Sequence, residues 1–219
     1  RARKLERISF EEMLELASVG AKVLQTRSVE LAMKLGVRVQ VVSSFEDKPG
    51  SLVVDEDEIV EQPVVSGIAY SRDDAKVTLR RVPDRPGVAA KVFDAMARAN
   101  VNVDMIVQNI GADSTTDMTF TVGKADLARA QDVLGKAQAE LGFEALIADP
   151  DVAKISVVGI GMRSHAGVAN TMFGALAEKG INIQVISTSE IKVSVLVAAD
   201  YTELAVRALH TAYGLDAPA

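Results

Sequence analysis

The chain has 219 residues, a formal net charge of -6, 48% hydrophobic residues, 25% charged residues and 4% aromatic residues. This length holds one large domain or about two to three small ones, and the composition is typical of a globular protein that buries a core. The acidic balance and the scarcity of aromatic side chains argue against a nucleic-acid-binding surface, which needs basic and stacking residues.

Other protein classes are excluded by what the sequence lacks. It has no cysteine, which excludes disulfide scaffolds, thiolate metal sites and cysteine nucleophiles. No apolar run approaches the roughly eighteen residues of a membrane span, and the basic start lacks the apolar core of a signal peptide. We therefore expect a cytoplasmic protein that binds neither membranes nor nucleic acids. Because the chain opens without methionine, in what reads as the approach to a helix, we also expect a fragment of a longer protein.

The first region shows the pattern of two helices followed by a strand. Ser9 and Glu12 have the spacing of a capping box, and an apolar helical stripe follows them. A second helix is expected at 28–35 and a strand at 37–42. This alternation of helix and strand indicates the C-terminal edge of an α/β domain, to which we assign residues 1–45.

An acidic stretch separates this region from the rest of the chain. Residues 46–63 are rich in Asp and Glu and contain the turn signal Lys48-Pro49-Gly50. The composition favours a solvated linker with room for one short strand at 52–54. We place the domain boundary in this stretch.

One pattern then occurs twice, with a period of about eighty residues that indicates tandem supersecondary units. The copies start at Lys76 and Lys154, and each reads strand, turn, helix, strand, strand, helix. The positions that agree are Gly87, Val88, Ala89, Phe93, Ala95, Ala97 and Asn102 in the first copy, and Gly167, Val168, Ala169, Phe173, Ala175, Ala177 and Asn182 in the second.

The expected elements of the first copy are a strand at 76–81, a helix from Val88, strands at 101–107 and 116–122, a helix from Asp126 and a strand at 143–148. In the strand at 101–107, alternation places Val101, Val103, Met105 and Val107 on one side, and Asn102, Asp104 and Gln108 on the other. The second copy is expected to form strands at 181–185 and 191–197 and a helix from Tyr201.

The ends of the two copies differ, which constrains the topology. The second copy stops soon after Tyr213 and lacks a fourth strand, whereas 64–70 upstream is strand-like and has no partner of its own. We predict that this strand completes the second copy. The first unit, 71–149, is then inserted into a second unit made of 64–70 and 150–219.

The turn before the first helix is a candidate binding site. Gly87 lets the backbone approach a ligand closely, and the helix beginning at Val88 directs free N–H groups toward it, which suits a carboxylate. Asp84 and Asp104 could face an ammonium group, so that one end of the unit would offer both halves of an amino-acid clamp. The alternative is a Pro-Gly turn without a ligand.

Two further motifs carry weaker signals. Gly159-x-Gly161 follows a strand and precedes a helix, as in dinucleotide-binding folds, but Ser164 stands at the third glycine position. His165 and His210 are the only histidines and lack metal-ligand spacing. A phosphate-binding loop of the Gly-x-x-x-x-Gly-Lys type does not occur. We therefore predict neither a catalytic site nor a metal site in this chain.

In the N-terminal region and in both copies of the repeat, the sequence resembles the C-terminal portion of bacterial aspartate kinases. These enzymes phosphorylate the side-chain carboxylate of aspartate with ATP. The likeness to the end of the family's amino-acid-kinase domain lies in residues 8–13 and 16–24. The likeness to its two ACT regulatory domains lies in residues 82–109, 115–117, 159–165 and 186–191. The resemblance covers essentially the whole chain.

The resemblance implies an α+β fold: two ferredoxin-like βαββαβ ACT domains, the first inserted in the second, preceded by the edge of the α/β kinase domain. It also implies that lysine and threonine bind at interfaces between ACT units and inhibit the kinase. The effector positions carried over to the first unit are Asp84, Arg85, Pro86, Gly87, Val88, Ala89, Asn102, Val103, Asp104 and Gln108. Those carried over to the second unit are Ala169, Asn170, Ile183, Gln184, Ser189 and Glu190. Ala166 departs from the proline that many relatives carry in that turn.

The family's catalytic lysine and most of its nucleotide site lie in sequence that precedes Arg1. The chain alone is therefore expected to lack kinase activity, and ATP and magnesium are expected only in the full enzyme, with its catalytic domain or subunit. We predict an amino-acid-sensing regulatory portion that dimerises through its ACT units. The alternatives are a stand-alone ACT module that regulates another partner, for which residues 1–45 would have no use, and a nucleotide-dependent enzyme using the Gly159 motif.

Overall fold

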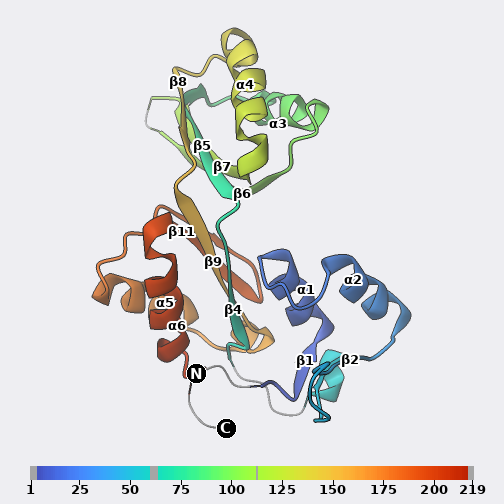
Figure 1. The fold of residues 1–219 in the computed structure, drawn as a ribbon. Helices are drawn as coiled ribbons and strands as arrows, with labels where there is room; N and C mark the ends of the chain where they lie inside the picture. Colours follow the sequence, from blue (N-terminus) through green and yellow to red (C-terminus); the bar gives the residue numbers. More distant parts are fainter. Residues whose placement is uncertain (1–3, 60–63, 112, 217–219) are drawn as a thin grey trace.

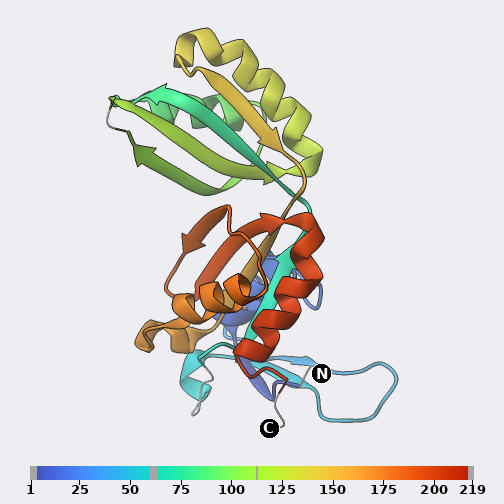
Figure 2. The same ribbon diagram turned by 90° about the vertical axis from the view of Figure 1, so that its left-hand side faces the viewer.

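The computed structural model describes residues 4–59, 64–111 and 113–216, which form three sheets with their covering helices. Two βαββαβ units lie one above the other, and an N-terminal part lies beside the lower one (Figure 1). We call 74–149 unit 1, and 67–71 together with 152–212 unit 2. The N-terminal part is 4–59. Figure 2 shows the same arrangement from the side, with unit 1 above unit 2.

Unit 1 has a four-stranded antiparallel sheet in the order β6-β7-β5-β8. Its elements are β5 (Asp74–Pro83), α3 (Val88–Arg98), β6 (Val103–Ile110), β7 (Thr115–Gly123), the 3-10 helix η2 (Lys124–Asp126), α4 (Leu127–Leu141) and β8 (Ala145–Asp149). Because β5 alternates buried and partly exposed residues, one sheet face packs on both helices, around Met96, Phe120 and Leu134.

Unit 2 has an antiparallel sheet in the order β10-β11-β9-β4. Its elements are β4 (Gly67–Ser71), β9 (Val152–Val158), η3 (Ile160–Ser164), α5 (Val168–Glu178), β10 (Val185–Thr188), β11 (Lys192–Ala198), η4 (Ala199–Tyr201) and α6 (Thr202–Ala212). The strand predicted at 181–185 is displaced and begins only at Val185. β4 precedes unit 1 in the sequence but pairs with β9, Ile68 opposite Val157, in the position that β8 occupies in unit 1.

The N-terminal part contains β1 (Arg7–Ser9), α1 (Phe10–Ser18), α2 (Thr26–Leu35), β2 (Val39–Val41), β3 (Ser51–Val54) and the 3-10 helix η1 (Glu56–Glu58). The predicted capping box is present at the start of α1. The Ser9 hydroxyl accepts a hydrogen bond from the Glu12 N–H at 3.1 Å, and the Glu12 carboxylate accepts one from the Ser9 N–H at 3.2 Å. These bonds satisfy N–H groups that have no partner within the helix.

The described part of the acidic stretch 46–63 is more than a solvated linker. β3 is the central strand of the N-terminal sheet, parallel to β1 and antiparallel to β2, and its Val53 and Val54 are buried. A boundary at residue 46 would therefore cut through this sheet. The short strand expected at 52–54 is present as β3, but the sequence did not predict its central place in the sheet, because the partners of β3 lie far from it in the sequence. Residues 60–63 lie outside the described residues.

A bulge in β6 changes the predicted alternation in unit 1. The register with β7 shifts between Asp104 and Val107, and Met105 has a positive φ of 47°. The apolar side chains predicted to share one face are therefore divided. Val101 and Val103 pack in the core of unit 1, whereas Met105 and Val107 pack against unit 2.

The unit 2 sheet contacts both other parts through the face opposite α5 and α6. Ala69 and Val158 pack in one cluster with Phe10 and Leu16 of α1. Further along the same face, Val152, Val185 and Leu196 contact the β6 side chains of unit 1. Unit 2 thus connects unit 1 with the N-terminal part. Among the described residues, no helix combines the length and apolar character that a bilayer crossing requires.

Candidate functional site

The turn between β5 and α3 lines a pocket of about 370 Å³. Most effector positions predicted in unit 1 surround it, together with strand residues: Asp84, Arg85, Pro86, Gly87, Val88, Ala89 and Gln108, with Val82, Pro83, Thr116 and Met118. Gly87 is the N-cap of α3 and has a φ of 92°, which glycine adopts without strain. Within the described chain, no side chain caps α3, and the Val88 N–H donates to the Arg85 carbonyl at 3.3 Å. The next N–H groups, those of Ala89 and Ala90, are therefore the ones that can bind a carboxylate at the pocket.

Asp84 places a carboxylate beside this helix N-terminus. Its backbone N–H donates to the Ser114 carbonyl at 2.9 Å, which fixes the turn against the connection between β6 and β7. Its side chain is exposed and is therefore accessible to a ligand. The pocket can thus present a carboxylate and a helix N-terminus to one small molecule.

Asp104 does not belong to this pocket, so the clamp predicted within one unit is wrong. Pro83 at the turn pairs with Thr115 of β7, whereas Asp104 pairs with Thr121. Six residues of strand separate these partners, a distance of about 20 Å. The reason is topological: α3 returns the chain to the opposite end of the sheet, so β6 starts far from the turn. Asn102 and Val103 lie at that far end with Asp104.

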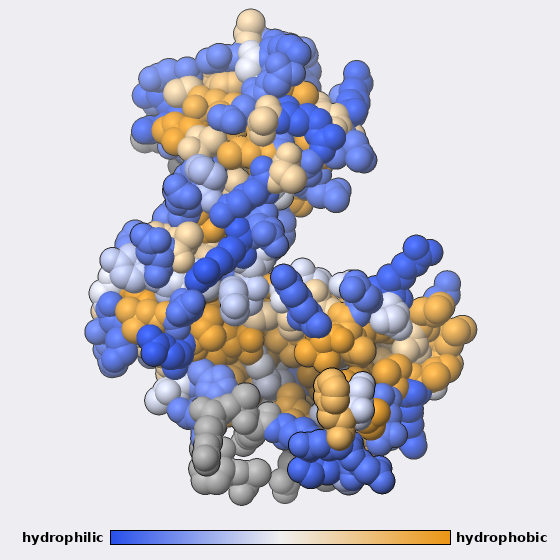
Figure 3. All heavy atoms as spheres, in the orientation of Figure 1, coloured by the Kyte–Doolittle hydropathy of each residue, from blue (hydrophilic) through white to orange (hydrophobic). Residues whose placement is uncertain are grey.

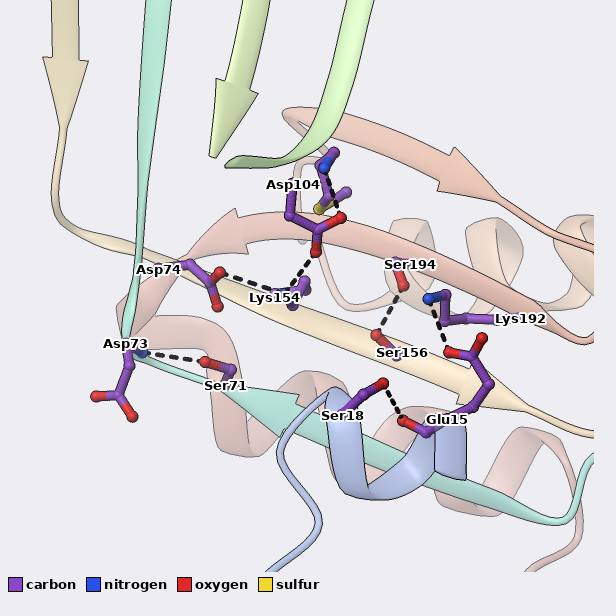
Figure 4. A network of polar contacts seen from close by, with 11 residues as sticks. Glu15, Ser18, Ser71, Asp73, Asp74, Asp104, Lys154, Ser156, Lys192 and Ser194 are labelled. Atoms are coloured by element: carbon purple, nitrogen blue, oxygen red, sulfur yellow. Dashed lines mark hydrogen bonds and ion pairs between the residues drawn. The ribbon is translucent and has the colours of Figure 1, made fainter. Parts of the chain in front are cut away.

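Asp104 instead pairs with a buried lysine of unit 2 (Figure 4). Lys154 Nζ lies 3.0 Å from Asp104 Oδ2 and 3.2 Å from Asp74 Oδ1. The Lys154 side chain is 9% exposed. Nearby on the same face of the sheet, the Ser156 and Ser194 hydroxyls share a hydrogen bond of 2.7 Å. The contact between the units therefore contains an ion-pair network as well as apolar packing.

The charges in this network shift the pKa values of its members. Burial tends to lower the pKa of Lys154, but the carboxylates of Asp74 and Asp104 together outweigh that effect and raise it. Burial likewise tends to raise the pKa of Asp104, but the hydrogen bond and the charge of Lys154 lower it below 3.8. Both shifts favour the ionised pair at neutral pH.

The effector positions predicted in unit 2 are also divided between two ends of a sheet. Ala169 and Asn170 lie in the first turn of α5, and Ser189 and Glu190 follow β10 at the same end, where the Gly159 N–H donates to the Ile191 carbonyl at 3.0 Å. The other two positions, Ile183 and Gln184, precede β10 at the opposite end. There the Gln184 side chain accepts a hydrogen bond from Lys76 of unit 1.

The Gly159 motif is explained by packing. A Cβ atom at Gly159 would lie 2.3 Å from the Val64 carbonyl oxygen, so glycine is needed for this close approach of two backbone segments. His165 Nδ1 lies 2.8 Å from the Gly161 carbonyl oxygen, a local contact within the turn. These contacts account for the motif without a nucleotide.

Three residues hold the parts together through contacts that sequence reasoning missed. Lys154 joins the two units, Glu12 reaches from α1 to η3, and Arg163 of η3 forms ion pairs with Glu56 at 2.8 Å and Glu190 at 3.6 Å. A lysine inside a largely apolar strand was a sequence signal from which the role of Lys154 could have been predicted. The partners of Glu12 and Arg163 are distant in the sequence and gave no local signal.

A family model described as ACT domain matches residues 80–138 and 155–213 of this chain. The first range lies within unit 1 and leaves out β8, and the second runs from β9 to the end of unit 2 and leaves out β4. The predicted α+β fold with two ACT repeats is therefore confirmed.

The chain is similar to the aspartate kinase of Pseudomonas putida, with 58% identity over 219 residues, 100% of this chain and 53% of that protein. It thus spans about half the length of this curated relative. The regulatory subunit of aspartate kinase from Thermus thermophilus is 44% identical and covers 68% of this chain, with 98% of that chain covered and a TM-score of 0.65. Aspartokinase III of E. coli, solved in complex with lysine and aspartate in a T-state, is 26% identical over 95% of this chain and 46% of that chain, with a TM-score of 0.75.

Proposed function

Because the chain belongs to the aspartate kinase family and carries the tandem ACT domains of its regulatory region, we propose that it senses lysine, threonine or both. Their binding inhibits ATP-dependent phosphorylation of aspartate, at the entry to lysine, threonine and methionine synthesis in the cytoplasm. The observation that carries this proposal is the pocket at the start of α3, which gathers Asp84, Gly87, Val88 and Gln108 beside an uncapped helix N-terminus. The lysine complex of the E. coli relative supports an amino-acid ligand.

We further propose that the effectors bind between ACT units. Asp84 and Asp104 lie at opposite ends of one sheet, about 20 Å apart along β7, and a free amino acid is far too short to reach both. A second copy of the chain can bring the far end of one sheet beside the turn of another. The division of the predicted effector positions in each unit therefore supports self-association.

The proposed domain organisation follows the strand pairing. Unit 1 is an ACT domain inserted in the second, and the antiparallel pairing of β4 with β9 supports this nesting. The N-terminal part is the edge of the kinase domain. It includes β3 and η1, so the segment that connects it to the ACT domains starts after Glu58 instead of at residue 46.

We propose that the catalytic portion of the enzyme covers the N-terminal part. Exposed apolar side chains gather there: Val23, Leu31, Leu35, Val37, Val42 and Phe45, all more than half exposed. Figure 3 shows this hydrophobic surface over α2. Apolar patches of this kind mark protein contacts. ATP and magnesium then bind in that portion, and the chain alone has no kinase activity.

A stand-alone ACT module that regulates another partner is the alternative. The packing of α1 on the unit 2 sheet speaks against it, because the kinase-like segment is part of the folded core. The test is aspartate phosphorylation by the full-length enzyme, measured with and without lysine and threonine. We expect inhibition by one amino acid or by the two together. A full-length enzyme whose rate is unaffected by both would contradict the proposal.

A further inference from the structure

Glu12 is buried between the N-terminal part and unit 2, with 2% of its surface exposed. Its Oε2 accepts hydrogen bonds from the N–H and the hydroxyl of Ser9, at 3.2 Å and 3.1 Å, and so completes the cap of α1. Its Oε1 accepts from the Ser66 hydroxyl at 2.5 Å and from the backbone N–H of Ile160 at 3.0 Å. One carboxylate therefore binds the start of α1 and the start of η3 at the same time.

Ile160 begins the connection 160–167, which leads from β9 to α5 and which we call the unit 2 loop. The residue before it is fixed on two sides: the Gly159 N–H donates to the Ile191 carbonyl, and the Val64 backbone fills the space where a Cβ would be. Two predicted effector positions lie next to this loop and its anchor. Ala169 is in the first turn of α5, just after the loop, and Glu190 precedes Ile191. A ligand held by them would act on the loop whose first N–H group is bound to Glu12.

A second link between the same parts runs over the surface. Arg163 of the unit 2 loop pairs with Glu56 of η1 at 2.8 Å, and Glu58 of η1 pairs with Arg38 at 2.7 Å. These side chains are partly or largely exposed, so their ion pairs are weak. The hydrogen bonds of Glu12 are buried and charge-assisted, and such bonds are stronger and more dependent on geometry. The hydrogen bonds of Glu12 thus connect the unit 2 loop to the N-terminal part more strongly than this surface link does.

We propose that Glu12 is the positioning residue that couples the unit 2 loop to α1, and through α1 to the catalytic portion. This inference rests on the proposed function, which supplies the amino acid that moves the loop. The physical basis is that the two helix starts share one buried acceptor group. A displacement of the Ile160 N–H must be followed by the carboxylate, or else leave a buried donor without a partner.

Hydrogen exchange measured by mass spectrometry on the chain tests the coupling without any ligand. The perturbation is Gly167→Ala: Gly167 has a φ of 97° and open space around its Cβ position, so the change strains only the local backbone. We expect several-fold faster exchange in the unit 2 loop and also in α1. In a Glu12→Ala background, Gly167→Ala should accelerate exchange in the loop only.

Ser9→Ala is the matched control, because it removes the other half of the capping box and leaves both bonds of Oε1 in place. It should raise the basal exchange of α1 but preserve the response of α1 to Gly167→Ala. Glu12→Gln keeps the side-chain shape and one oxygen acceptor, and should give a reduced response if Glu12→Ala does not fold. An α1 response of equal size with and without the Glu12 carboxylate would overturn the inference.

A second arm separates this coupling from the proposed function. Lysine and threonine are added to the unmodified chain and to Glu12→Ala, and exchange is followed in the loop and in α1. We expect slower exchange in both segments of the unmodified chain but only in the loop of the variant. If neither amino acid alters the loop while Gly167→Ala still alters α1 through Glu12, the coupling stands and the proposed effectors are wrong.

Discussion

At the scale of single residues, Asp84 and Lys154 have opposite environments. Asp84 is exposed at a pocket and contributes little to packing, whereas Lys154 is buried between two carboxylates at the contact of the two units. A change at Asp84 should therefore alter binding, and a change at Lys154 should alter stability. These two expectations can be measured separately.

Replacing Asp84 by Ala should weaken binding of lysine or threonine by about ten-fold or more. A hydrogen bond to a charged group contributes about 1.5–3 kcal/mol, and about 1.4 kcal/mol corresponds to a factor of ten. The melting temperature should not change, because the side chain is exposed. Calorimetric titration measures the affinity.

The control is Asp132→Ala, which removes an exposed carboxylate of α4 paired with Lys136 and should bind like the unmodified chain. Equal affinities for Asp84→Ala and Asp132→Ala would remove the turn from the site.

Replacing Lys154 by Met should lower the free energy of unfolding by roughly 3 kcal/mol, since it leaves the largely buried Asp74 carboxylate without its cation. The estimate lies at the low end of the range for buried pairs, because the Asp104 side chain is 61% exposed. Urea unfolding gives the value. Asp104→Asn, which removes the more exposed partner, should cost less than Lys154→Met. The reverse order would contradict the account of this network.

The same network predicts a pH dependence. The folded-state pKa of Asp104 is lowered below 3.8, so its stabilising effect is complete above that pH and is lost as the pH falls through the folded-state value. The pKa of Lys154 is raised above 10.5, so its contribution is complete below 10.5 and is lost as the pH rises through its folded-state value. The difference in unfolding free energy between the unmodified chain and Asp104→Asn should therefore be constant near neutral pH and shrink in acid. A difference that grows as the pH falls would refute this assignment.

At the scale of elements, β4 connects distant parts of the sequence. It pairs with β9 and also contributes Ala69 to the cluster that holds α1. A Cβ atom at Gly20, just after α1, would lie 2.2 Å from the Tyr70 carbonyl oxygen, which shows how closely the N-terminal part approaches this strand. Loss of β4 should therefore affect unit 2 and the N-terminal part before it affects unit 1.

Deleting residues 64–70 should remove hydrogen-exchange protection from 155–158 in β9 and leave it in 77–79 of β5. The reason is that β9 loses a neighbouring strand, whereas β5 keeps both β7 and β8. Amide exchange followed by NMR or mass spectrometry resolves the two segments. Equal loss of protection in both would show that the units do not depend on β4 differently.

Features with local sequence signals could be predicted. The Ser9 and Glu12 spacing gave the start of α1, and the repeated turn with Gly87 and Gly167 gave the starts of α3 and α5. The central position of β3 in its sheet could not be predicted from the sequence, because it depends on pairing with strands that lie elsewhere in the chain. The bulge at Met105 was not predicted either, because the expected alternation of side chains between the two faces assumes a regular strand.

In the candidate site, too, residues with a local sequence signal were predicted and contacts between distant parts of the chain were not. The turn argument found Asp84, Gly87 and Val88, and the resemblance added their neighbours in the same consecutive run, Arg85, Pro86 and Ala89. Asp104 was placed at the wrong end of the sheet because the clamp argument did not take into account that α3 returns the chain to the end opposite the turn. Glu12 was found as a cap, but its second oxygen bonds to Ile160, a contact that no local pattern specifies.

At the scale of the whole molecule, the effector positions predicted in each unit are divided between the two ends of its sheet. The turn at one end of the sheet and the residues before the second strand at the other end are too far apart for one amino acid. β6 and β8 of unit 1 and β10 and β4 of unit 2 are also edge strands of their sheets within this chain. Such edges are commonly paired with another chain.

The chain should therefore form a dimer, with a self-complementary interface between ACT units. Analytical ultracentrifugation should give a mass of two chains, and added lysine or threonine should strengthen the association because the ligand is shared by two units. A monomer at all concentrations, with and without both amino acids at millimolar levels, would contradict this prediction.

The most direct measurement is a calorimetric titration of the chain with lysine, with threonine, and with each in the presence of the other. The account predicts saturable binding of at least one of them, weakened in Asp84→Ala and retained in Asp132→Ala. No heat of binding in any of the titrations, for a sample whose fold is intact by circular dichroism, would contradict the claim that this chain is the amino-acid-sensing part of an aspartate kinase.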